Sequence, residues 1–209
     1  MNKKQTVLFF GDSITDNGRD YSNPDSLGAE WSYSHCVKLA KKLPLKYPEI
    51  DFKFYNRGIN GHTTYDLLQR VQKDCIDLKP DVIILLIGIN DIWAHGEDDE
   101  FTKTNYTKLI QTIKENLKDT KLIIVAPFLL DLENADPTWR KNLERKLKII
   151  DEYIKPHADV FIEPDKLFKS VYTKYITPEC FSYDGVHPSE AGYVLIANEI
   201  LEHTDKIFK

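Results

Sequence analysis

Residues 82–91 read VIILLIGIND, and this stretch decides the fold class. Its first six residues are apolar without alternation, a pattern typical of a central parallel strand buried on both faces. Residues 122–126 (LIIVA) repeat the pattern, and shorter apolar runs predict strands at 6–10, 52–56 and 160–162. The chain therefore contains five candidate strands, of which the third and fourth should lie in the middle of a sheet.

Helical patterns separate these strands. Leu109, Ile113 and Leu117 recur four residues apart, which places their side chains on one face of a helix. Strands that alternate with helices form parallel sheets through right-handed crossover connections. We therefore expect a single α/β domain over residues 1–209, a flavodoxin-like three-layer α/β/α sandwich with a five-stranded parallel sheet. Helices are predicted near 32–42, 64–76, 101–117, 137–154, 165–174 and 189–201.

The composition argues against several classes of function. The 209 residues carry a net charge of -5, and the basic residues are scattered, so we expect no nucleic-acid partner and no membrane partner. No apolar run approaches the length of a transmembrane helix. Cys36, Cys75 and Cys180 are widely spaced and odd in number, which predicts reduced thiols and a cytoplasmic location.

Four blocks of glycine and polar residues lie at predicted strand ends or just before the last helix. They are GDSIT (11–15), NRGING (56–61), GIND (88–91) and DGVHP (184–188). The carboxyl ends of parallel strands meet at one edge of a sheet, where open α/β proteins bind their ligands. We therefore expect these four blocks to surround one crevice.

The first and last blocks contain the parts of an activated nucleophile. A serine hydroxyl is weakly nucleophilic unless a base accepts its proton and a third group orients that base. Ser13, His187 and Asp184 fit these three roles, although a helix N-cap would be the favoured explanation for Ser13 taken alone. The middle blocks offer donors for an oxyanion, because glycine lets a backbone N–H approach closely and asparagine carries a neutral amide.

Together the four blocks resemble the GDSL family of esterases and lipases, in its SGNH subgroup. The resemblance implies the SGNH hydrolase fold and a catalytic triad of Ser13, Asp184 and His187. It also implies an oxyanion hole formed by the N–H groups of Ser13 and Gly61 and by the side chain of Asn90. No metal and no organic cofactor are implied.

Within the subgroup, residues 10–16, 87–93, 126–128 and 184–188 are most similar to small intracellular acetylxylan esterases. This implies a small-molecule ester substrate, an acetylated oligosaccharide built from xylose, and is compatible with a homo-oligomer. Trp93 and Tyr183 are candidates for a substrate-binding wall, with core packing as the alternative for either. The roles of Trp31, His62 and the 128–139 loop stay open.

Three other functions fit parts of the sequence. The same machinery could serve a thioesterase, a lysophospholipase or an arylesterase, but the polar loops at 18–30 and 128–139 favour a small acyl group. A two-metal phosphoesterase is disfavoured because few histidines lie at strand ends. A carbohydrate-binding protein without catalysis would leave the complete set of catalytic side chains unused.

Overall fold

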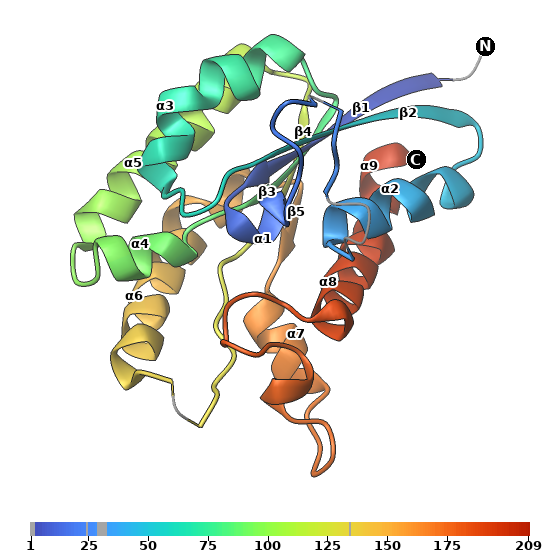
Figure 1. Cartoon of the computed structure of the whole chain (residues 1–209). Coiled ribbons are helices and arrows are strands. Elements are labelled where there is room, and N and C mark those ends of the chain that lie inside the picture. Colours follow the sequence, from blue (N-terminus) through green and yellow to red (C-terminus); the bar gives the residue numbers. More distant parts are fainter. Residues whose placement is uncertain (1–2, 24, 29–32, 134) are drawn as a thin grey trace.

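Five parallel strands form the central sheet of the computed structural model, in the order β2-β1-β3-β4-β5 (Figure 1). The structure describes residues 3–23, 25–28, 33–133 and 135–209. The strands are β1 Lys3–Gly11, β2 Ile50–Gly58, β3 Val82–Leu86, β4 Lys121–Val125 and β5 Val160–Ile162. This order is that of flavodoxin-like sheets, so the predicted fold class is confirmed.

Helices cover both faces of the sheet. One face packs against α3 and α5, and the other packs against α2 and α8 (Figure 1). The helices are α1 Ser13–Asp16, α2 His35–Lys46, α3 Thr64–Asp74, α4 Ile89–Ala94, α5 Asp99–Asn116, α6 Pro137–Tyr153, α7 Pro164–Ser170, α8 Glu190–His203 and α9 Asp205–Phe208. The three layers predicted from the alternation of strands and helices are therefore present.

The central strands contribute side chains to both layers of the core. Along β3, Val82 and Ile84 belong to the cluster that includes α2 and α8, whereas Ile83 and Leu85 belong to the cluster with α3 and α5. All five β3 side chains are buried. This explains why the 82–87 run lacks the alternation of a strand with one solvent-facing side.

The carboxyl ends of three neighbouring strands lie level with one another. Gly11 on β1 pairs with Gly58 on β2 and with Leu86 on β3. A Cβ atom on Gly58 would lie 2.2 Å from the backbone nitrogen of Asp16, so only glycine lets α1 pack against the end of β2. The register thus brings the segments after β1, β2 and β3 to the same edge.

The structure differs from the sequence-based expectations in local detail. No helix was expected at Ile89–Ala94, where α4 lies, because six residues are too few to show a helical periodicity in the sequence. Helix α2 continues through Pro44 to Lys46. In the 128–139 loop, which was expected to be polar, Phe128, Leu129 and Leu130 are buried in the core. Trp31 and part of the 18–30 loop lie outside the described residues.

In the described ranges, every helix is either too short or too polar to cross a membrane.

Candidate active site

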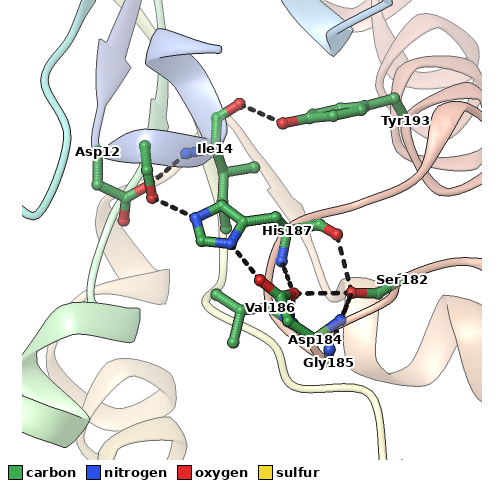
Figure 2. A network of polar contacts seen from close by, with 9 residues as sticks. Asp12, Ile14, Ser182, Asp184, Gly185, Val186, His187 and Tyr193 are labelled. Carbon is green, nitrogen blue, oxygen red and sulfur yellow. Dashed lines mark hydrogen bonds and ion pairs between the residues drawn. The ribbon is translucent and has the colours of Figure 1, made fainter. Parts of the chain in front are cut away.

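Ser13, His187 and Asp184 form one chain of hydrogen bonds at the carboxyl edge of the sheet. Nε2 of His187 lies 2.9 Å from Oγ of Ser13. Nδ1 of His187 lies 2.6 Å from Oδ2 of Asp184 (Figure 2). An imidazole in this position can take the proton of the serine hydroxyl, while the carboxylate fixes its tautomer. The structure therefore brings together three residues that span 174 positions of the sequence between Ser13 and His187.

Ser13 is the first residue of α1, directly after β1. Oδ1 of Asp12 accepts a hydrogen bond of 3.0 Å from the Ile14 N–H and caps this helix. The hydroxyl of Tyr193 on α8 donates to the Ile14 carbonyl at 2.9 Å, which holds α1 from the other side (Figure 2). Among the described residues, the backbone N–H of Ser13 has no acceptor, as expected for the first turn of a helix.

The loop that carries Asp184 and His187 is held by its own polar groups. Oδ1 of Asp184 accepts hydrogen bonds from the N–H groups of Val186 at 2.9 Å and His187 at 2.8 Å (Figure 2). The buried Ser182 hydroxyl lies 2.8 Å from the His187 carbonyl, and it accepts from the Gly185 N–H at 2.9 Å. The loop therefore orients both triad side chains although each is about half exposed, at 51% for His187 and 53% for Asp184.

These contacts also set the charge of Asp184. Partial burial works to raise its pKa, but hydrogen bonds from the His187 ring and from the His187 and Val186 N–H groups outweigh that effect. The pKa of Asp184 is therefore lower than usual, and the carboxylate is ionised at neutral pH. An ionised carboxylate can stabilise the imidazolium that forms when His187 accepts a proton.

The start of the 128–139 loop contacts the Asp184–His187 segment and supports it. The Leu130 N–H donates to the Gly185 carbonyl at 2.8 Å, and Leu129 and Leu130 are buried. A Cβ atom on Gly185 would lie 2.9 Å from the Leu130 carbonyl oxygen, and the φ of this glycine is +82°. The close approach and the positive φ together require glycine between the two triad residues.

Asn90 and Gly61, the two predicted oxyanion donors, lie on segments that contact each other. Nδ2 of Asn90, in the first turn of α4, donates to the His62 carbonyl at 2.9 Å. Gly61 precedes His62 and has a φ of +75°. Among the described residues its backbone N–H has no acceptor, so it is free to bind a ligand. His62, whose role the sequence leaves open, thus connects the Asn90 side chain to the segment of Gly61.

Asp91, the last residue of the GIND block, is fully buried and joins three helices. Its carboxylate accepts from the N–H of Thr64 at 2.9 Å, the hydroxyl of Thr64 at 2.7 Å and the hydroxyl of Thr102 at 2.9 Å. It therefore joins the starts of α3 and α5 to α4, next to Asn90. The sequence feature that could have identified Asp91 as a supporting residue is its position inside the GIND block.

A second buried acid, Asp12, lies directly before Ser13. Burial raises the pKa of Asp12 to about 7, opposed by the hydrogen bond from Ile14 and assisted by the nearby charge of Asp91. Its Oδ2 atom has no hydrogen-bond partner among the described residues. Ser13 therefore follows a carboxyl group whose pKa lies near neutral pH.

The two predicted wall residues have different surroundings. Trp93 is partly buried against the core and meets Trp139 edge to face, with ring centroids 5.4 Å apart. Tyr183 is 90% exposed and directly precedes Asp184. Only Tyr183 thus presents most of its side chain to a ligand in solution.

Within the part of the chain that the structure describes, no group of three or more His, Cys, Asp or Glu side chains is arranged to hold a metal ion.

Comparison with known proteins gives the same picture as the geometry. The model of the GDSL-like lipase/acylhydrolase family matches residues 9–195. The chain is 29% identical to an acetylxylan esterase of Geobacillus stearothermophilus over 94% of this chain and 92% of that protein. A GDSL-like lipase from Parabacteroides merdae superposes with a TM-score of 0.82 at 31% identity, covering 99% of this chain and 98% of the other.

The acetylxylan esterase Axe2 from Geobacillus stearothermophilus superposes with a TM-score of 0.79 at 25% identity, covering 100% of this chain and 96% of Axe2. Catalytic mutants of Axe2 with alanine in place of a serine, an aspartate or a histidine match as well. In Axe2 the aspartate and the histidine lie three positions apart, as do Asp184 and His187 here. The chain belongs to the GDSL-like lipase/acylhydrolase family and is a carboxylic-ester hydrolase.

Proposed function

We propose that this esterase removes acetyl groups through an acyl-enzyme formed on Ser13. The continuous hydrogen-bond chain from Asp184 through His187 to the Ser13 hydroxyl carries the proposal. His187 takes the Ser13 proton as Oγ attacks the acetyl carbonyl, and then protonates the departing sugar hydroxyl. In the second half of the reaction His187 activates a water molecule that releases acetate and restores Ser13.

The oxyanion is bound by three donors in this proposal: the N–H groups of Ser13 and Gly61 and the amide of Asn90. Support comes from the two backbone N–H groups, which have no acceptor among the described residues, and from the His62 carbonyl, which orients the Asn90 amide. A donor aimed at developing negative charge in such a site contributes about 2.7–4 kcal/mol to lowering the barrier. The reaction proceeds without a metal or an organic cofactor.

The substrate we propose is an acetylated xylo-oligosaccharide. Axe2, which matches along this whole chain, is an acetyl-xylooligosaccharide esterase. Tyr183 is exposed beside Asp184 and contacts the sugar, because a tyrosine ring offers both an apolar face and a hydroxyl. Trp93, packed against Trp139, is the second candidate for the wall that contacts the sugar.

A cytoplasmic location fits the cysteines, since Cys36, Cys75 and Cys180 all carry free thiols. In that compartment the substrate is a short imported oligosaccharide, and the protein acts alone or as a homo-oligomer.

A substrate panel tests this proposal. Acetate release is measured from acetylated xylo-oligosaccharide, acetylated glucose and acetylated chitin fragments, with p-nitrophenyl esters of increasing chain length alongside. We expect the largest kcat/KM for the xylose substrate, a steep decline beyond the acetyl ester, and loss of all turnover in Ser13→Ala. A preference for long acyl chains would favour a lysophospholipase or a thioesterase instead.

A further inference from the structure

Arg70 lies on α3 outside the four sequence blocks, yet its guanidinium contacts three segments of the site. It donates to the carbonyl of Gly11 at 3.0 Å and to the carbonyl of Arg57 at 2.8 Å. Its Nε donates to Nδ1 of His62 at 3.1 Å. Asp74, one helical turn further on, accepts from the same group at 3.0 Å. The side chain, 12% exposed, therefore ties the ends of β1 and β2 to the loop that follows β2.

The contact with Arg70 decides the state of the His62 ring. A guanidinium only donates hydrogen bonds, so Nδ1 of His62 must be the acceptor and the ring proton lies on Nε2. Burial lowers the pKa of His62, and the positive charge of Arg70 lowers it further. His62 is therefore a neutral ring with one tautomer and one orientation, although it lies in a surface loop.

The backbone carbonyl of His62 in turn fixes the orientation of the Asn90 side chain. The amide of Asn90 has two N–H groups, and one of them donates to the His62 carbonyl at 2.9 Å. Because an amide group is planar, this bond fixes the direction of the second N–H. The contacts thus form a series from Arg70 through His62 to the amide of Asn90.

We propose that Arg70 is a positioning residue for ester hydrolysis, which holds the 59–63 loop through the His62 ring and thereby aims the second N–H of Asn90 at the oxyanion. The inference rests on the proposed function, in which Asn90 is an oxyanion donor. The inference goes beyond that function because it assigns a role in turnover to Arg70, a residue of α3 outside the four sequence blocks.

A double-mutant cycle on the acetyl ester tests the inference. Asn90→Ala should lower kcat by about 10²–10³-fold with little change in KM. Arg70→Met should lower kcat by about 10–100-fold, again with KM within about threefold of the wild type. If Arg70 acts through Asn90, adding Arg70→Met to Asn90→Ala should lower kcat by no more than about threefold.

Two further variants separate positioning from stability. Arg145→Met is the matched control, because the Arg145 guanidinium also bonds a carboxylate and a backbone carbonyl, those of Asp99 and Glu97. We expect it to lower Tm while kcat stays within about threefold of the wild type. His62→Phe removes the ring acceptor and leaves Arg70 in place, so it should reproduce the kcat loss if Arg70→Met does not fold.

The possible failures of this experiment are distinguishable. Losses for Arg70→Met and Asn90→Ala that multiply would overturn the inference and leave the oxyanion role of Asn90 intact. An unchanged kcat in Arg70→Met, or in His62→Phe, would also overturn it. Full activity of Asn90→Ala would remove the donor itself, and the inference would fall together with that part of the proposed function.

Discussion

The two halves of the proposed triad lie in opposite surroundings. The segment around Ser13 is enclosed: Asp12, Ile14 and Thr15 are fully buried, and α1 lies against the end of β2. The loop that carries Asp184 and His187 leaves both side chains about half exposed. The first segment is held mainly by its burial in the core, and the second mainly by hydrogen bonds of its own loop and of Leu130.

The comparison shows two ways to hold a catalytic group still. Enclosure fixes the Ser13 segment together with hydrogen bonds from distant side chains, those of Tyr193 to the Ile14 carbonyl and of Asn56 to the Thr15 carbonyl, but it forces the Asp12 carboxyl group into the core. The exposed loop avoids that cost, because water solvates its charges and Ser182 bonds its backbone. Apart from Ser13 itself, we therefore expect substitutions on the enclosed side to act mainly on stability, and substitutions in the loop to act mainly on turnover.

On the loop side, the largest effect is expected from Asp184→Asn. The amide can no longer hold His187 in the tautomer that accepts the Ser13 proton, so kcat should fall by about 10⁴-fold. The measurement is the steady-state kinetics of acetyl ester hydrolysis. Asp98→Asn, which alters the exposed cap of α5, serves as the control and should retain wild-type kcat. A loss below tenfold for Asp184→Asn would show that the loop carboxylate is dispensable.

On the enclosed side, Asp12→Asn should change stability with pH. Burial raises the pKa of Asp12 from the usual value of 3.8 to about 7, so the wild type loses stability as the pH rises through this range. Asparagine keeps the cap on Ile14 and never ionises. Its advantage in unfolding free energy over the wild type should therefore grow by about 3 kcal/mol between about pH 5 and about pH 8.

Urea denaturation of both proteins at the two pH values measures this difference. An advantage of Asp12→Asn that is equal at the two pH values would show that Asp12 does not titrate in this range.

The smallest effect is expected from Ser182→Ala, which removes the hydroxyl that organises the loop. We expect kcat to fall by about tenfold and the unfolding free energy by about 1–2 kcal/mol, since the Gly185 N–H loses its acceptor. Ser170→Ala is the matched control, because that exposed hydroxyl also bonds a backbone carbonyl, on Leu167. Equal kcat values for the two variants would contradict the loop's dependence on Ser182.

The sheet was predictable from sequence because buried parallel strands leave continuous apolar runs, and all five strands were located. The residues proposed for the triad were predictable as well, since each lies in a short block beside a strand end or helix start. Helix α4 was missed because Gly88 precedes it without a side-chain cap. A six-residue helix is also too short to show periodicity.

The supporting residues were not predictable, because their partners are distant in sequence. Arg70 contacts Gly11 across 59 positions, and Asp91 contacts Thr64 across 27. Nothing in the local pattern distinguishes such an arginine from a solvated residue on a helix surface. The packing of Trp93 against Trp139 was not predictable either, since it depends on how α4 meets α6.

The most direct test of the account is covalent labelling of the nucleophile. A fluorophosphonate reagent is added to the active enzyme, and peptide mapping by mass spectrometry locates the label. We predict that the label is on Ser13, that activity is lost in proportion to labelling, and that His187→Ala is not labelled. Inactivation with the label on another side chain, or full activity with Ser13 labelled, would contradict the account.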